Sequence, residues 1–248
     1  MTLDGTIREL AQTMGADFFG VADLSRAHGA ILDQGGPAIA EFPRAISVGI
    51  ALLHPIVDQL PQRDDPTVAM TYRHHCYDLV NQRLDHIASR LSSMLQREGY
   101  KALPVPASQT VDNDRLCGIF SNKMAAHLSG LGWIGKSCLL VTPEAGPRTR
   151  WATVLTNAPL KGTGEPMDQR CGSCQECVDI CPPRAFTGEP FREEESRDVR
   201  FAVQECKRYF DEMKEATGVP VCGLCLYVCP FGKKQGEKAK QKGNYYDH

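Results

Sequence analysis

The stretch RCGSCQECVDICPPRAF, residues 170–186, places four cysteines in one short run. Their order is Cys-x2-Cys-x2-Cys-x3-Cys-Pro, the run of bacterial ferredoxins, in which three thiolates hold one 4Fe-4S cluster and the fourth Cys binds a second cluster. Zinc sites usually carry two ligand pairs with a longer spacer between them, and disulfides are rare in a reducing compartment. The run therefore predicts iron-sulfur clusters rather than zinc or disulfide staples.

A second set of cysteines completes this pattern. Cys222-x2-Cys225-x3-Cys229-Pro is one ligand short of a full run, and Cys206 upstream can supply the missing thiolate. If the last Cys of each set crosses to the other cluster, two 4Fe-4S clusters share eight metal ligands. The predicted ligands of cluster one are Cys171, Cys174, Cys177 and Cys229, and those of cluster two are Cys181, Cys206, Cys222 and Cys225. Two clusters in one small module form a short electron path, so another group must receive the electrons.

Composition narrows the class of protein. The chain has 248 residues, of which 42% are hydrophobic and 23% charged, as in an ordinary globular protein. A formal net charge of -2 does not point to nucleic acid or an anionic membrane as the main partner. The N-terminus has no basic segment followed by an apolar run, and no stretch approaches the ~20 apolar residues that span a bilayer. We expect a cytoplasmic protein with no membrane partner.

Hydrophobic periodicity predicts helices and strands outside the cysteine-rich part. The expected elements are helices at 3–14, 77–98 and 122–129, strands at 17–23, 44–52 and within 99–107, and a hairpin at 138–157 that turns near 144–147. This mixture favours an α/β (mixed α+β) fold. We predict an α/β domain at 1–162, a ferredoxin-like domain at 163–232 and a basic tail at 233–248, which we interpret as a solvated tail rather than a phosphate-binding arm.

The loop GLGWIGKS, residues 130–137, satisfies both the G-x-G-x-x-G and the G-x4-G-K-[ST] patterns of nucleotide-binding proteins. Both motifs require a strand that delivers the glycines to the N-terminus of a helix. Here a predicted helix precedes the loop and the strand-like CLLVT follows it, which argues against nucleotide hydrolysis. The glycines allow the backbone to approach a large flat ligand, and a tight turn with Trp133 buried in the core is the alternative.

Several segments together resemble epoxyqueuosine reductase and its relatives, the cobalamin-dependent iron-sulfur reductases that include reductive dehalogenases. They are VDNDRL (111–116), GLGWIGKSCLL (130–140), VLTNAPL (154–160), the full cluster run and CGLCLYVCPFG (222–232). The resemblance covers most of the chain. It implies base-off cobalamin in a nitroreductase-like α/β domain, followed by a ferredoxin-like module with two 4Fe-4S clusters.

The resemblance also implies roles for individual residues. Asp112 matches the family's acidic residue and would be the catalytic proton donor, and the alternative for Asp112 is a turn or helix-capping residue. The predicted cofactor-binding residues are Tyr72, Asp112, Gly132, Trp133, Ile134, Gly135, Lys136 and Ser137. Cys117 is a reactive thiol, a neighbour of cobalt or, as the favoured alternative, a buried inert thiol.

The implied function is a reductase in which the clusters pass electrons to cobalamin for reductive deoxygenation or dehalogenation of an unidentified substrate. Asn113 to Cys117 depart from the family's usual segment after its acid, and the chain lacks the helical-repeat extension that helps many epoxyqueuosine reductases hold tRNA, so tRNA is not the favoured substrate. A low-potential flavodoxin or ferredoxin would donate the electrons. The alternatives are an electron-transfer protein that serves a corrinoid or other partner enzyme, and a corrinoid carrier or assembly protein.

Overall fold

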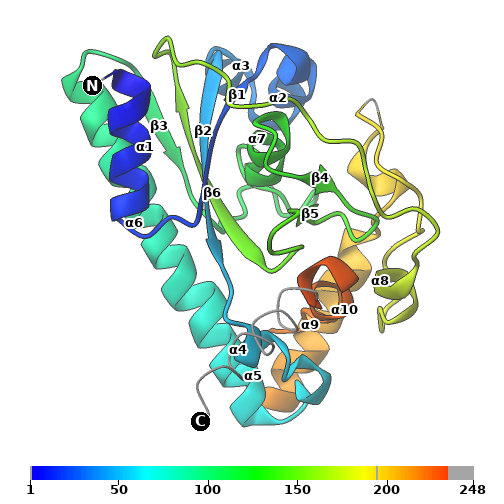
Figure 1. Ribbon diagram of the computed structural model, residues 1–248. Helices are drawn as coiled ribbons and strands as arrows, with labels where there is room; N and C mark the ends of the chain where they lie inside the picture. Colours follow the sequence, from blue (N-terminus) through cyan, green and yellow to red (C-terminus); the bar gives the residue numbers. More distant parts are fainter. Residues whose placement is uncertain (1, 194, 234–248) are drawn as a thin grey trace, which may run out of the picture. The chain divides into compact units, whose positions relative to one another are not determined.

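A computed structural model describes residues 2–193 and 195–233 of the chain (Figure 1). The chain divides into two compact units, each built from separate stretches of sequence. Unit 1 contains the described parts of Met1–Ala51, Cys76–Gly132 and Arg150–Asp168, and unit 2 those of Leu52–His75, Trp133–Thr149 and Gln169–His248. The domain ranges 1–162 and 163–232 stay a prediction, and the predicted basic tail lies outside the described residues after Lys233.

Unit 1 is built on a four-stranded sheet in the order β1-β2-β6-β3. The strands are β1 (Phe18–Asp23), β2 (Arg44–Ala51), β3 (Ala102–Val105) and β6 (Thr149–Thr156). β1 pairs antiparallel with β2, and β3 pairs antiparallel with β6. The two inner strands are buried almost throughout, which explains why β2 reads as a continuous run of apolar and small residues.

Helices cover both faces of this sheet (Figure 1). α1 (Leu3–Thr13) packs on β1 and on α6 (Val80–Arg97), and α6 contacts β2 and β3. The buried stripe of α6 includes Val80, Leu84, Ile87, Leu91 and Leu95, as the periodicity predicts. The predicted helix start at Tyr77 is three residues early, because a π-helical segment, His74–Leu79, precedes the regular helix.

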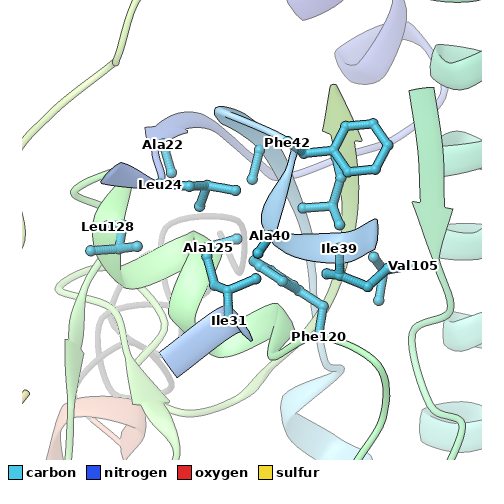
Figure 2. Close-up of a cluster of buried hydrophobic side chains, with 12 residues drawn as sticks. Ala22, Leu24, Ile31, Ile39, Ala40, Phe42, Val105, Phe120, Ala125 and Leu128 are labelled. Carbon is cyan, nitrogen blue, oxygen red and sulfur yellow. The ribbon is translucent and has the colours of Figure 1, made fainter. Parts of the chain in front are cut away.

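The opposite face of the sheet holds a second apolar core (Figure 2). α2 (His28–Gly35), α3 (Pro37–Ala40) and α7 (Asn122–Leu128) contribute side chains to it, and the strands contribute Ala22, Ala45, Val105 and Leu155. Ser121 caps α7 by accepting a hydrogen bond from the Met124 N–H. This core fixes the end of α7, from which the glycine-rich loop departs.

Unit 2 consists of short elements joined by loops. Its helices are α4 (His54–Val57), α5 (Pro66–Arg73), α8 (Glu176–Asp179), α9 (Val203–Thr217) and α10 (Leu224–Val228). β4 (Trp133–Ile134) and β5 (Leu140–Val141) form a two-stranded sheet. Within this unit α5 contacts α9, and α8 contacts α10.

The predicted hairpin at 138–157 is wrong. β5 pairs with β4 rather than with the strand that follows it, and β6 enters the larger sheet between β2 and β3. The expected turn does exist, since Thr142 and Gly146 exchange backbone hydrogen bonds, but the chain changes partner after it. Turn chemistry is local, whereas the choice of strand partner depends on distant segments. In the described ranges, no helix is both long and apolar enough to cross a membrane.

Candidate iron-sulfur and cofactor site

All eight predicted ligand cysteines lie in unit 2 and are free thiols. α8 carries Cys177, α9 carries Cys206 and α10 carries Cys225, while the other five lie in turns and loops beside these helices. Three helices each present one Cys, and the loops beside them supply the others. The structure thereby brings together residues more than fifty positions apart in the chain.

One group forms around Cys177. Burial, followed by the neighbouring thiols of Cys171, Cys229 and Cys174, raises the pKa of the Cys177 thiol to about 12. Cys229 in turn has its pKa raised by burial and by Cys171 and Cys174, although backbone N–H donors from Phe231 and Gly232 oppose the shift. These four residues are the set predicted for cluster one, including the crossed ligand Cys229.

A second group forms around Cys206 and Cys225. Burial raises the pKa of Cys206 to about 12, with added contributions from Cys222 and Cys181. The pKa of Cys225 is raised by burial first, then by Cys222, Cys206 and Cys181, and least by Cys177. This is the set predicted for cluster two, and the weak influence of Cys177 on Cys225 links the two groups.

Such largely half-buried thiols suit metal ligation, because a bound metal replaces the proton and compensates the charge of the thiolate. In a 4Fe-4S cluster four thiolates together hold the iron atoms. Among the residues that the structure describes, no three His, Cys, Asp or Glu side chains are placed to hold one metal ion. The ligand assignment therefore rests on the convergence of two sets of four thiols.

The two Cys-Gly-x-Cys turns share a backbone conformation. Gly172 has φ 52° and Gly223 has φ 77°, both in the left-handed region that favours glycine. Their surroundings differ. A Cβ on Gly223 would lie 2.8 Å from both Leu60 Cδ1 and Tyr72 Oη, whereas among the described residues a Cβ on Gly172 would meet no heavy atom within 4 Å. The turn at Gly223 is thus packed against Leu60 and Tyr72 of the same unit, whereas the turn at Gly172 has free space beside its glycine.

The glycine-rich loop forms the hairpin of β4 and β5. The Gly135 N–H donates to Leu139 O at 2.9 Å, and the Cys138 N–H donates to Gly135 O at 2.9 Å. A Cβ on Gly135 would lie 2.9 Å from Val141 Cγ2 and 3.6 Å from the Cys171 sulfur, so this part of the hairpin lies beside a predicted cluster ligand. α7 precedes the loop and β5 follows it, the order that the sequence predicts and that argues against a nucleotide site.

The other predicted cofactor residues of this loop are buried. Trp133 is 1% exposed and packs edge-on against Phe231, with ring centroids 4.8 Å apart. Ile134, Lys136 and Ser137 are also buried in unit 2. The Lys136 ammonium donates to Gly172 O at 2.9 Å and to Cys174 O at 3.1 Å. Lys136 thus supports the first Cys-Gly-x-Cys turn.

The remaining predicted contacts are divided between the units. Tyr72, 3% exposed on α5, lies against Gly223 in unit 2. Gly132 ends a stretch of unit 1, where its carbonyl lies 3.0 Å from His127 Nδ1. Each of these positions stays a prediction with respect to cobalamin.

Asp112 lies in unit 1, in a turn closed by backbone hydrogen bonds between Asp112 and Cys117. Its Oδ1 accepts from the N–H groups of Asp114, at 3.0 Å, and Arg115, at 2.8 Å. The side chain therefore adopts the turn-capping geometry that is the alternative to a catalytic role. Arg115 anchors the turn to α2 through an ion pair with Asp33 at 2.7 Å.

Sequence reasoning missed the contribution of residues 52–75 to unit 2. Arg63 from this stretch donates hydrogen bonds to the Cys222 side chain and, at 2.5 Å, to Tyr209 Oη. Arg148, 1% exposed, pairs with Asp58 at 2.8 Å and donates to Tyr227 O. No local motif marks these arginines, because their partners are far away in the sequence.

Comparisons with known proteins agree with this site. Residues 170–232 match the model of the 4Fe-4S double cluster binding domain. The epoxyqueuosine reductase of Pseudomonas aeruginosa is 26% identical over 231 residues, which cover 90% of this chain and 61% of that protein. The chain thus spans about three-fifths of the length of this curated relative.

Two solved structures share the fold. A reductive dehalogenase, described with a mechanism for B12-dependent dehalogenation, has a TM-score of 0.66 at 20% identity and covers 95% of this chain and 33% of its own. An epoxyqueuosine reductase with an epoxyqueuosine-modified tRNA-Tyr stem loop has a TM-score of 0.60 at 18% identity, covering 94% and 66% respectively. The predicted α/β fold and the predicted resemblance are confirmed. Residues 170–232 form a 4Fe-4S double cluster binding domain in a chain similar in sequence to epoxyqueuosine reductases and in fold to them and to a reductive dehalogenase.

Proposed function

We propose that the chain is an oxidoreductase in which two 4Fe-4S clusters pass electrons to a base-off cobalamin that reduces a C–O or C–halogen bond. The observation that carries the proposal is the convergence of eight free thiols into two sets of four in unit 2. The influence of Cys229 on Cys177, and of Cys181 on Cys206 and Cys225, supports a crossed arrangement in which each run of cysteines would serve both clusters. The clusters would supply one-electron transfer over a short path.

Cobalamin is supported by the fold shared with a dehalogenase whose structure is described with a B12-dependent mechanism. One buried donor also fits such a cofactor. Trp133 Nε1 is buried and, within the described residues, has no hydrogen-bond partner. The acetamide groups of a corrin ring carry the acceptors that such a donor needs. Bound cobalamin would supply a reduced cobalt centre that removes oxygen or halide from the substrate.

Asp112 is the proposed proton donor. Its turn holds one carboxylate oxygen, Oδ1, on two backbone N–H groups, whereas Oδ2 accepts no hydrogen bond from the described residues. A carboxyl group held in this way keeps one oxygen available to carry a proton to a substrate. The anchoring of the turn by Arg115 and Asp33 would limit the positions that Asp112 can take.

We propose the substrate and the electron donor only as chemical classes. One neighbour in fold is an epoxyqueuosine reductase solved with an epoxyqueuosine-modified tRNA-Tyr stem loop, so RNA is one candidate substrate class. Residues Asn113 to Cys117, which follow the proposed acid, depart from the segment that epoxyqueuosine reductases usually have there. We therefore favour a substrate other than tRNA. A low-potential flavodoxin or ferredoxin would reduce the clusters. The cytoplasmic location stays a prediction.

Anaerobic electron paramagnetic resonance tests this proposal. The reconstituted protein is mixed with cob(II)alamin, passed through gel filtration and measured before and after dithionite. A retained base-off cobalt signal that disappears on further reduction supports the proposal, whereas cluster signals without retained corrinoid refute it. The variant Asp112→Asn should retain the cobalt signal and lose turnover with a halogenated phenol as a trial substrate.

One observation favours a second candidate, an electron-transfer protein that serves a partner enzyme. Trp133 packs on Phe231 and Lys136 is bound to the first cluster turn, so both side chains already have partners in unit 2. If corrinoid is not retained while both clusters cycle reversibly, this candidate replaces the reductase.

A further inference from the structure

Each group of four thiols is accompanied by a cation from outside the matched domain 170–232. Lys136 lies next to the first group. Its side chain is 6% exposed, and its ammonium donates to the carbonyls of Gly172 and Cys174, which flank the first turn. Carbonyls leave the positive charge uncompensated, and the described residues provide Lys136 with no ion pair. A buried lysine is rarely found without such a partner.

Arg63 lies next to the second group. Its guanidinium donates to the Cys222 side chain and to Tyr209 Oη on α9, the helix that also carries Cys206. The guanidinium carbon lies 5.6 Å above the centre of the Tyr209 ring. Arg63 Nε is buried and, among the described residues, without a hydrogen-bond partner. Arg63 therefore lies between Cys222 and α9, and its Nε–H remains available as a hydrogen-bond donor.

We propose that Lys136 and Arg63 are positioning residues, one for each cluster, and that each raises the reduction potential of its own cluster. Lys136 would act on the cluster of Cys171, Cys174, Cys177 and Cys229, and Arg63 on the cluster of Cys181, Cys206, Cys222 and Cys225. The proposal rests on the cluster pair and does not depend on cobalamin.

The physical reason is the charge that a cluster gains on reduction. Each one-electron reduction adds one negative charge to a cluster that four thiolates already make anionic. A fixed cation nearby stabilises the reduced form more than the oxidised form, and burial weakens the screening of this attraction by water. Net charge, hydrogen bonds to sulfur and solvent exposure are the known determinants of cluster potential. Two different cations would let the two clusters differ in potential, which gives electron flow a direction.

The test is a potentiometric titration of the reconstituted protein with dithionite, followed by electron paramagnetic resonance. The variants are Lys136→Met and Arg63→Met, which remove the charge at similar length. We expect Lys136→Met to lower the reduced-to-oxidised ratio of one cluster about tenfold at its wild-type midpoint, a shift of about 59 mV for a one-electron couple. Arg63→Met should shift the other cluster in the same direction, and neither variant should move both.

Conservative variants separate charge from packing. Lys136→Arg and Arg63→Lys should restore most of the wild-type potential, because they keep the cation. Lys214→Met is the matched control, since Lys214 is an exposed residue of α9 in the same unit and its loss should leave both potentials unchanged. If a methionine variant fails to assemble its cluster, Lys136→Gln or Arg63→Gln, which keeps a donor without the charge, is titrated in its place.

The proposal is overturned if the neutral variants leave both midpoints unchanged or shift both clusters equally. It is also overturned if Lys136→Arg shifts its cluster as much as Lys136→Met, because the effect would then come from packing. These midpoint potentials require only the clusters, so they test the proposal whether or not corrinoid binds. Loss of corrinoid binding with the expected potential shifts would refute the reductase and leave this inference intact.

Discussion

The two Cys-Gly-x-Cys turns allow one stability prediction to be made in depth. Replacement of Gly172 or Gly223 by Ala places a Cβ in the left-handed region, which costs about 1 kcal/mol for either residue. At Gly223 the new Cβ would also lie 2.8 Å from Leu60 Cδ1 and from Tyr72 Oη, and 3.1 Å from Tyr72 Cζ. Overpacking of this kind typically costs about 1–3 kcal/mol.

Gly223→Ala should therefore destabilise the protein by about 2–4 kcal/mol, and Gly172→Ala by about 1 kcal/mol. The difference of about 1–3 kcal/mol corresponds to roughly 5- to 150-fold in the unfolding equilibrium. The measurement is anaerobic urea unfolding of the reconstituted proteins by circular dichroism, with iron and sulfide content determined in parallel. Gly223→Ala should also lose the iron of one cluster, because Cys222 and Cys225 flank the altered residue.

A second-site variant tests the stated cause. Tyr72→Phe removes the hydroxyl oxygen that meets the new Cβ, so the double variant Gly223→Ala/Tyr72→Phe should recover part of the lost stability relative to Tyr72→Phe alone. Equal destabilisation by Gly172→Ala and Gly223→Ala would refute the reasoning. An absence of recovery in the double variant would show that Tyr72 does not oppose the substitution.

Three further predictions concern other parts of the chain. Asp112→Asn keeps an oxygen that can accept from the Arg115 N–H, so the turn should persist while turnover falls about 10²- to 10⁴-fold in a steady-state assay; unchanged turnover would exclude proton donation by Asp112. Leu91→Ala empties a fully buried position of α6 in unit 1 and should cost about 2–5 kcal/mol in urea unfolding while both clusters still assemble; simultaneous loss of the clusters would contradict this prediction. Burial, followed by the positive charge of Arg148, lowers the pKa of His54, so protons bind the unfolded state more readily and stability should fall as the pH drops below about 6.5. A urea series from pH 8 to 5 should show this fall in the wild type and a weaker one in His54→Gln.

The sequence alone determined the chemistry of the cluster site. The spacing of Cys171, Cys174, Cys177 and Cys181 specifies thiolates that one short loop can present, because ligand geometry depends on near neighbours in the chain. The periodicity of α6 and the apolar run of β2 were readable for the same reason, since a helical stripe and a buried strand are local patterns. The crossed grouping of the ligands stays a prediction from the two cysteine runs, and the influence of Cys229 on the pKa of Cys177 is consistent with it.

The tertiary structure decided which distant segments meet. The pairing of β5 with β4, and the entry of β6 between β2 and β3, depend on competition among strands that have similar local sequences. The contacts of Arg63 with Cys222, and of Lys136 with the turn at Gly172, join segments that no short motif relates. Such contacts form because the folded chain buries the cations beside the thiols, and burial is a property of the whole fold rather than of any window of sequence.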